Sequence, residues 1–151
     1  MKKSLQIMLS IAAVAILFAC ASQPETTAPV PQNPTEESLA SAYERYAAAL
    51  ILDGAERYTV VRGDTLSQIA NAKYPSGFYY PVIMLASRNI VLDPDRITPG
   101  MVLTIPDIQR NLNNATARAN IKEFLFEIAI IENQRNRAQT ADGIRTLANS
   151  L

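Results

Sequence analysis

The residue types that most enzymes use for acid–base and metal chemistry are scarce in this sequence. Its 151 residues include no histidine and a single cysteine, Cys20, which excludes a histidine general base and a cysteine–histidine zinc site. Asp93 and Asp95 lie close together, and paired carboxylates can cleave glycosidic bonds. Pro94 stands between them, a pattern that turn formation explains better. The sequence therefore predicts a protein that is not an enzyme and needs no metal or cofactor.

Cys20 stands at the end of a segment typical of export. Two lysines precede an apolar run over residues 7–18, which is too short to span a bilayer comfortably. The ending Leu17-Phe18-Ala19-Cys20 resembles the lipobox of bacterial lipoproteins, which implies cleavage before Cys20 and lipidation of its side chain and amino group with acyl chains such as palmitate. An ordinary secretory signal, cut near Ala19 or Ala21, is the alternative.

Residues 1–19 are thus predicted to be a lipoprotein signal peptide and residues 20–34 a disordered tether. The tether is rich in proline and threonine, and apart from Val30 it has no large apolar residue, so it cannot bury enough surface to fold. Ala21 follows the cysteine in place of aspartate, which favours the periplasmic face of the outer membrane within a bacterial cell envelope. Without its two N-terminal lysines the chain is slightly acidic, so no nucleic-acid partner is expected.

Helices are predicted on both sides of a central unit. Residues 35–56 form an amphipathic helix, because apolar residues recur at helical spacing at Leu39, Tyr43, Tyr46 and Leu50. Residues 107–151 form a C-terminal helical extension, with an apolar stripe at Ile121, Phe124, Leu125, Ile128 and Ile131 and further apolar surface on the other side at Phe126 and Ile130. This extension needs a partner surface, either the central unit or another protein.

The first half of the central unit combines a strand, a turn and a helix start. Residues 58–61 alternate as a half-buried strand does. Gly63 ends it where a positive φ is most easily tolerated. Asp64 or Thr65 can then accept a hydrogen bond from the first helical turn, and Gln68 lies at capping-box spacing from Thr65. The pattern predicts a helix that starts directly after the turn.

The second half mirrors this order. A second helix is predicted to start at Pro81, since proline is well tolerated in a first helical turn, and residues 101–105 form a second strand that Pro106 ends.

The order strand, helix, helix, strand over residues 57–106 resembles a LysM domain. The motifs that carry the resemblance are Gly63-Asp64-Thr65-Leu66 at the first junction, and Asn89, Ile97-Thr98-Pro99-Gly100-Met101-Val102-Leu103 and Ile105-Pro106 towards the end. The resemblance implies an α+β fold with a two-stranded antiparallel sheet, flanked in this chain by N- and C-terminal helices.

LysM domains bind glycans that contain N-acetylglucosamine, chiefly peptidoglycan and chitin, and the resemblance implies the same activity here. In the family the ligand groove lies between the first strand–helix loop and the loop before the last strand. Carried over to this sequence, the predicted glycan-binding residues are Gly63, Asp64, Thr65, Leu66, Asn89, Ile90, Val91 and Leu92.

Several of these residues also have a purely structural interpretation. Asp64 and Thr65 can act only as helix caps, and Asn89 can end the second helix. Ile90 and Leu92 are the better candidates for the floor of a groove, although one of them can equally belong to the core.

Two further features of the central unit can be interpreted in more than one way. The aromatic residues 78–80 can stack on a sugar, but packing explains them better beside a proline at a helix start. The loop of Asp93 and Asp95 is similar to that of cytoplasmic LysM proteins that respond to potassium, which makes a cation site there a minor alternative.

The leading hypothesis is a non-catalytic lipoprotein that is anchored in a membrane through Cys20 and binds peptidoglycan through one LysM domain. The alternative is a scaffold or accessory protein whose flanking helices bind a protein partner, such as a cell-wall hydrolase.

Overall fold

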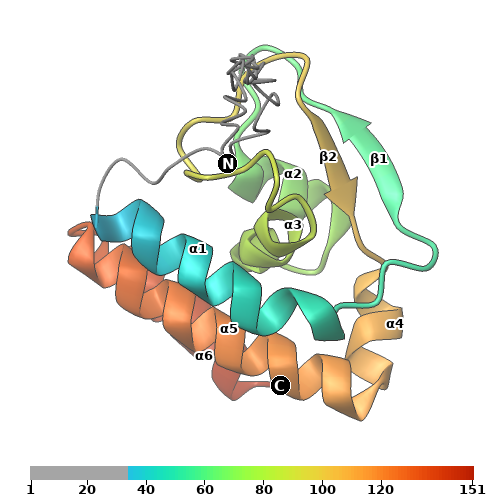
Figure 1. Cartoon of the computed structure of the whole chain (residues 1–151), viewed down its shortest axis with the longest axis vertical. Helices are drawn as coiled ribbons and strands as arrows, with labels where there is room; N and C mark the ends of the chain where they lie inside the picture. The colour runs from blue at the N-terminus through green and yellow to red at the C-terminus, as the bar shows by residue number, and fades with distance from the viewer. Residues whose placement is uncertain (1–33) are drawn as a thin grey trace, which may run out of the picture.

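A computed structural model describes residues 34–151. The predicted signal peptide, the tether up to residue 33 and Cys20 lie outside the described residues. The elements in chain order (Figure 1) are α1 (Pro34–Tyr46), η1 (Ala47–Ala49), β1 (Glu56–Thr59), α2 (Leu66–Lys73), η2 (Gly77–Tyr79), α3 (Tyr80–Ala86), β2 (Val102–Ile105), α4 (Ile108–Asn113), α5 (Ala115–Gln134) and α6 (Ala138–Asn149).

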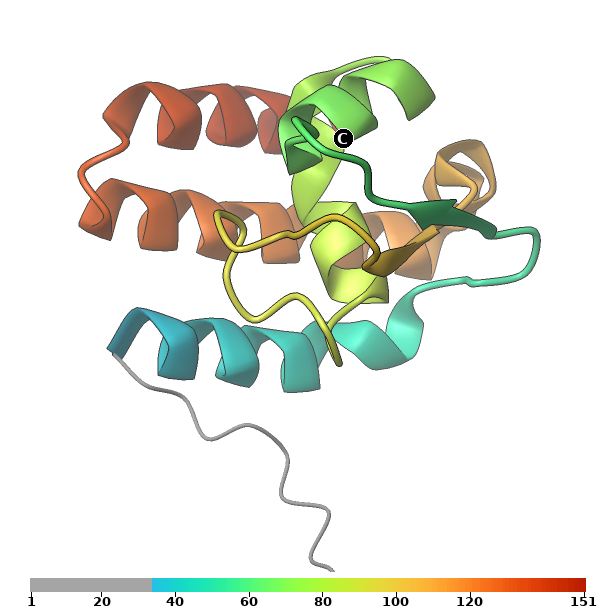
Figure 2. The ribbon, with the colours of Figure 1, turned by 90° about the horizontal axis from the view of Figure 1, so that it is seen from above.

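The central unit has the predicted α+β topology. β1 and β2 pair antiparallel, with Tyr58 opposite Leu103, and α3 packs between this small sheet and α5. The three longest helices lie side by side, with α5 between α1 and α6 (Figure 2). α3 and η2 therefore join the sheet and α2 to a layer formed by the flanking helices.

Local signals set the start of α2 as expected. Gly63 has a φ of 96°, and Thr65 caps the helix in a complete capping box: its side chain accepts from the Gln68 amide, and the Gln68 side chain accepts from the Thr65 amide. The strand before this turn begins two residues earlier than predicted and ends at Thr59. Val60, just after it, is 2% exposed and belongs to the core.

A single hydrophobic core joins the flanking helices to the central unit. It includes Tyr43 of α1, Ile83 of α3, Leu103 of β2 and Ile144 of α6, all buried. Phe124 of α5 is fully buried, and its ring centroid lies 6.1 Å from that of Tyr43 and 5.7 Å from that of Tyr46. A lone LysM-sized unit of about 50 residues would bury only about 60% of its chain surface, so the added helices enlarge a marginal core.

The α5 stripe faces this core, whereas the apolar surface on its other side is not fully covered. Every residue of the predicted stripe, from Ile121 to Ile131, is buried, but Ile130 is 55% exposed and Phe126 is half-buried. The extension thus finds its main partner surface within the same chain.

Polar side chains tie the flanking segments to each other and to the central unit. The buried Asn111 side chain in α4 accepts from the Ile51 amide and donates to the Ile51 carbonyl, both at 2.9 Å. The Tyr43 hydroxyl donates to the Val91 carbonyl at 2.8 Å. Burial, with the nearby charge of Asp93, raises the pKa of Tyr43, so this hydroxyl remains a donor at neutral pH.

At Gly143, α6 approaches the Phe78 ring of η2 closely. A Cβ atom added there would lie 2.2 Å from Cζ of Phe78. We expect Gly143→Ala to lower the free energy of unfolding, because it displaces the Phe78 ring although alanine favours a helix by about 1 kcal/mol. In a Phe78→Ala background the same change should raise stability by about 1 kcal/mol. Urea denaturation of the four proteins measures this reversal, and equal effects in both backgrounds would contradict the contact.

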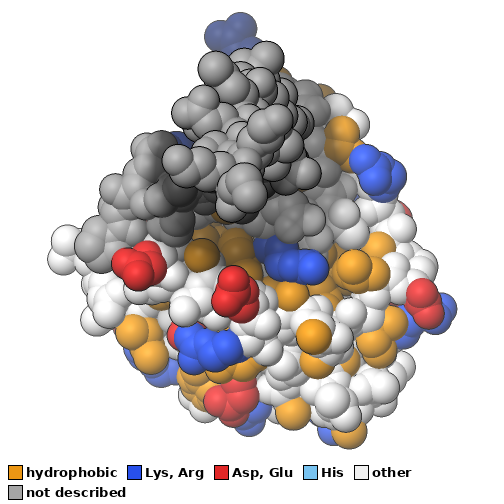
Figure 3. Space-filling model, in the orientation of Figure 1, with side chains coloured by type: hydrophobic (Ala, Val, Ile, Leu, Met, Phe, Trp, Pro, Cys, Tyr) orange, Lys and Arg blue, Asp and Glu red, His pale blue; other side chains and the backbone are white. Residues whose placement is uncertain are grey.

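None of the helices in residues 34–151 is both long and apolar enough to cross a membrane. On the face shown in Figure 3, away from the grey atoms, acidic and basic side chains alternate with apolar ones over α1 and α5. No area of a single sign stands out on that face.

Candidate functional site

A hollow of about 230 Å³ lies where the first loop of the central unit meets the loop before β2. We call it the loop–helix hollow. Its lining comes from residues 64–67, from Tyr80 in α3, from the loop before β2 at Pro94, Asp95 and Ile97, and from the start of α6 at Arg137 and Thr140. The hollow thus lies beside the first loop, as the family's groove does, with an additional wall from the C-terminal extension.

The first predicted loop lies at this hollow. The Asp64 carboxylate accepts from the Tyr58 hydroxyl at 2.8 Å and from the Val61 amide at 2.9 Å. The hydrogen bond to Asp64 raises the pKa of Tyr58. Asp64 therefore closes the turn, while Thr65 caps α2, and both still line the hollow. Leu66 also lines it, but at 2% exposure it belongs chiefly to the core.

The second predicted loop does not line this hollow. Asn89 is exposed, and Ile90 is 43% exposed away from it. Val91 is 1% exposed, with its carbonyl bound by Tyr43. Leu92 is half-buried and lines a different, smaller cavity instead. The structure brings the first loop together with residues 94–97, a few positions further along the chain.

The aromatic run next to α3 is used for packing. Tyr79 and Tyr80 are 5% and 4% exposed, and the Phe78 ring lies against Gly143. The Tyr79 ring stands edge-on to Tyr74, with centroids 5.9 Å apart. These contacts agree with the packing interpretation and leave no aromatic face for a sugar in this run.

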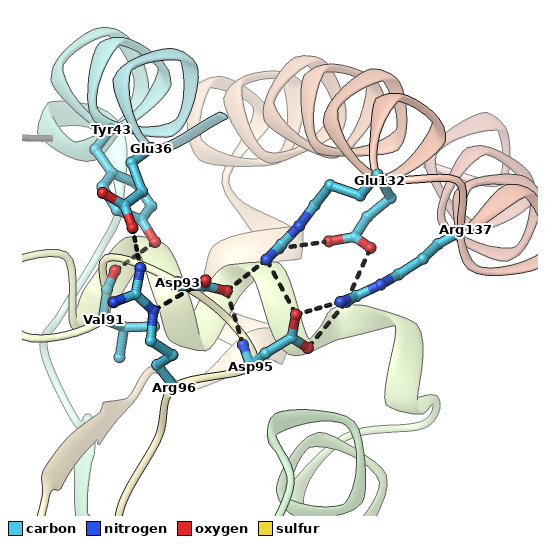
Figure 4. A network of polar contacts seen from close by, with 9 residues as sticks. Glu36, Tyr43, Val91, Asp93, Asp95, Arg96, Glu132 and Arg137 are labelled. Carbon is cyan, nitrogen blue, oxygen red and sulfur yellow. Dashed lines mark hydrogen bonds and ion pairs between the residues drawn. The ribbon is translucent and has the colours of Figure 1, made fainter. Parts of the chain in front are cut away.

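The loop of Asp93 and Asp95 is held by arginines, of which Figure 4 labels Arg96 and Arg137. Arg135 Nη2 donates to Asp93 Oδ1 at 2.6 Å and to Asp95 Oδ2 at 3.0 Å. Arg137 donates to both carboxylate oxygens of Asp95, and Arg96 pairs with Asp93 and with Glu36 of α1. The loop is thereby fixed to α1 on one side and to the α5–α6 turn on the other.

A buried carboxylate lies at the centre of this ionic network. Glu132 is 1% exposed and pairs with Arg135 at 3.5 Å and with Arg137 at 3.4 Å. Burial, followed by the charge and hydrogen bond of Glu132, raises the pKa of Tyr80. An adjoining cavity of about 20 Å³, lined in part by Glu36, Asp93 and Glu132, has room and polar partners for one water molecule.

Sequence reasoning did not find the residues that α6 and its preceding turn contribute. Arg137 and Thr140 lie more than 70 residues along the chain from the first loop, and no short motif marks them. The Asp-Pro-Asp element at residues 93–95 can be recognised in the sequence. Its arginine partners at 135 and 137 can be identified only once the packing of α5 and α6 is known.

Glycine is favoured at position 63 by the backbone conformation and not by a lack of space for a side chain. Its φ of 96° is strained for other residues, while an added Cβ would meet no atom within 4 Å. We expect Gly63→Val to lower the free energy of unfolding by about 1–2 kcal/mol. Gly63→Asn is the matched control and should cost less, since asparagine visits positive φ more readily. Chemical denaturation compares the two variants, and equal costs would contradict a backbone origin.

Asp93 links stability to pH. Burial raises its pKa, but hydrogen bonds from the Asp95 amide, Arg135 and Arg96 outweigh burial and hold the pKa below its usual value of 3.8. A carboxyl whose folded pKa is lowered contributes stability above its unfolded pKa and loses it as the pH falls through the folded pKa. The stability difference between wild type and Asp93→Asn should therefore be full at pH 6 and shrink below about pH 3.8. Urea denaturation across this range measures it, and a difference that grows towards acid would contradict the sign.

Comparison with known proteins identifies the class of the central unit. Residues 58–106 match the model of the LysM domain family, so the strand–helix–helix–strand unit with its first-loop hollow is a LysM domain. LysM domains are in general non-catalytic modules that bind glycans containing N-acetylglucosamine, peptidoglycan among them.

The chain is also similar to a protein named "Potassium binding protein Kbp" from Escherichia coli O6:H1. The two are 36% identical over 69 residues, which is 46% of this chain and 46% of the relative. The match thus spans about half of the relative's length. A search of the solved structures found no significant match.

Proposed function

We propose that this protein binds glycans that contain N-acetylglucosamine, peptidoglycan foremost, at the loop–helix hollow, and that it does so without cleaving them. The observation that carries the proposal is the LysM domain at residues 58–106 with a hollow beside its first loop. The lining mixes hydroxyl, carboxylate and apolar side chains, which is the combination that a sugar with hydroxyl and acetamido groups requires.

The proposal that the protein does not cleave glycans rests on the ion pairing of Asp93 and Asp95, the carboxylate pair considered above. Asp93 and Asp95 are both engaged by arginines at 2.6–3.0 Å. A general acid must carry a proton at working pH, and the lowered pKa of Asp93 opposes that role.

Retention on purified peptidoglycan and isothermal titration with chitin or muropeptide fragments of several lengths test the binding. For a single shallow site we expect a dissociation constant between micromolar and millimolar. Ser67→Trp, which places bulk in the hollow, should abolish retention. Ala72→Trp, an exposed position on α2 that does not line the hollow, is the control and should leave it intact. If Ser67→Trp is retained as well as wild type, the glycan site does not lie at this hollow.

We further propose that the protein is held in the bacterial cell envelope by acyl chains on Cys20, at the periplasmic face of the outer membrane. The lipobox-like residues 17–20 support this. Each buried methylene of an acyl chain contributes about 0.8 kcal/mol, so two or more chains make release negligible. Mass spectrometry of membrane-extracted protein should find acyl mass on Cys20, and Cys20→Ala should release the protein. An unmodified Cys20 would overturn the anchor.

A second candidate function rests on a groove of about 410 Å³ along the seam of α1 and α5. The half-buried Phe126 and the exposed Ile130 line it, with Arg45 and Glu127 at its edge. Here the protein would be a scaffold or accessory subunit that binds a protein such as a cell-wall hydrolase. Ile130→Lys should then abolish co-purification of that enzyme and leave glycan binding unchanged.

The name of the relative raises potassium binding as a third activity. In this chain the carboxylates of Asp93 and Asp95 already face two guanidinium groups, those of Arg135 and Arg137. Within residues 34–151, no cluster of three or more acidic, histidine or cysteine side chains is placed to hold a metal ion. Like charges disfavour a cation at this loop, so we do not assign this activity to it.

A further inference from the structure

The loop–helix hollow has a wall that lies outside the LysM domain. The family match ends at residue 106, yet Arg137 and Thr140, at the start of α6, line the hollow together with the first loop. α6 begins directly after a tight turn in which Asn136 has a φ of 61°. The turn places Arg137 against Asp95 of the loop before β2.

Two independent contacts fix this wall in position. Arg135 and Arg137 bind the carboxylates of Asp93 and Asp95 at the N-terminal end of α6 (Figure 4). Further along the helix, the Phe78 ring lies against Gly143, which has no side chain to hold it off. Thr140 lies between these two attachment points, so its place at the hollow is determined by the fold.

The polar groups that face the hollow divide into engaged and available ones. Asp64 closes the first turn, and Asp95 is bound by both arginines. The hydroxyls of Ser67 and Thr140, by contrast, have no hydrogen-bond partner among residues 34–151. These two hydroxyls are therefore the side-chain groups best placed to accept and donate hydrogen bonds to a ligand.

The charges at the hollow favour an uncharged ligand. Its lining holds two carboxylates and one guanidinium, and that guanidinium is shared between Asp95 and the buried Glu132. A carboxylate on the ligand would meet a lining of net negative charge with its cation already paired. Hydroxyl and amide groups carry no such penalty.

We propose that α6 forms part of the glycan site, with Thr140 as a ligand-contacting residue and Arg137 as a positioning residue, and that the site takes uncharged acetamido sugars in preference to anionic ones. This inference rests on the proposed function, because it names the ligand class and an additional wall of that same site. It assigns a binding role to the C-terminal extension, which the LysM match does not cover.

Isothermal titration of the full-length protein with the tetramer of N-acetylglucosamine tests the wall. Thr140→Trp fills the hollow and should weaken binding at least 10-fold. Gln139→Trp, the neighbouring exposed position that does not line the hollow, should bind as wild type does. Thr140→Val removes only the hydroxyl at nearly constant volume and should weaken binding about 3- to 10-fold. If thermal denaturation shows that Thr140→Trp does not fold, the binding measured with Thr140→Val alone tests the role of Thr140.

The same tetramer of N-acetylglucosamine with its C6 hydroxymethyl groups oxidised to carboxylates keeps the linkages and acetamido groups; it tests the charge preference and should bind at least 10-fold more weakly than the neutral tetramer. Equal or tighter binding of the anionic sugar would overturn that part. Binding by Thr140→Trp and Thr140→Val equal to wild type, with Ser67→Trp inactive, would overturn the role of α6 while the proposed function stands. Failure of wild type to bind peptidoglycan and the tetramer would overturn both.

Discussion

Phe124→Ala is expected to lower the free energy of unfolding by about 3–5 kcal/mol, because it opens a cavity in a fully buried site where the rings of Tyr43 and Tyr46 meet α5. This is a large part of the 5–15 kcal/mol that typical domains possess. Since one core joins α1, the LysM domain and the extension, the loss should lower the melting temperature of the whole described unit. Thermal unfolding by circular dichroism measures it.

Phe126→Ala is the matched control on the same helix. Its side chain is only half-buried, so the same chemical change should cost markedly less. Two separate transitions in the Phe124→Ala variant, with the LysM domain melting at its wild-type temperature, would contradict a shared core. They would show that the flanking helices unfold independently of the LysM domain.

Local signals made the central unit predictable. Thr65 and Gln68 lie three residues apart and form their capping box with no help from the rest of the fold. Gly63 adopts positive φ because the turn between strand and helix demands it. Such features depend on neighbours in sequence. The antiparallel pairing of β1 with β2 joins segments that are far apart in the chain, and it was predicted only from the resemblance of residues 57–106 to a known domain.

Contacts between distant segments were not predictable in the same way. The partners of Asp93 and Asp95 lie about 40 residues further along the chain, and nothing in the sequence distinguishes Arg135 and Arg137 from solvated surface arginines. Gly143 looks like a helix-weakening residue until the Phe78 ring is seen against it. The position of the hollow beside residues 94–97, rather than 89–92, is a product of these long-range contacts.

The second large effect is expected when both arginines of the α5–α6 turn are replaced. Arg135→Met with Arg137→Met leaves Glu132, 1% exposed, without either of its cations. An unpaired buried charge costs about 3–5 kcal/mol, so the double variant should be strongly destabilised in urea denaturation. Arg145→Met removes a pair with Asp142 in which both side chains are largely exposed, and as the control it should cost less than about 1 kcal/mol.

The origin of this effect is tested by removing the buried charge as well. Adding Glu132→Gln to the double variant eliminates the uncompensated carboxylate while the amide can still accept a hydrogen bond from Tyr80. The triple variant should therefore recover much of the lost stability, because breaking a buried ion pair is costly chiefly through the charge left behind. A triple variant no more stable than the double would show that the arginines act through their contacts with Asp93 and Asp95 instead. In that case the attachment of the loop before β2, and with it the shape of the loop–helix hollow, would account for the loss.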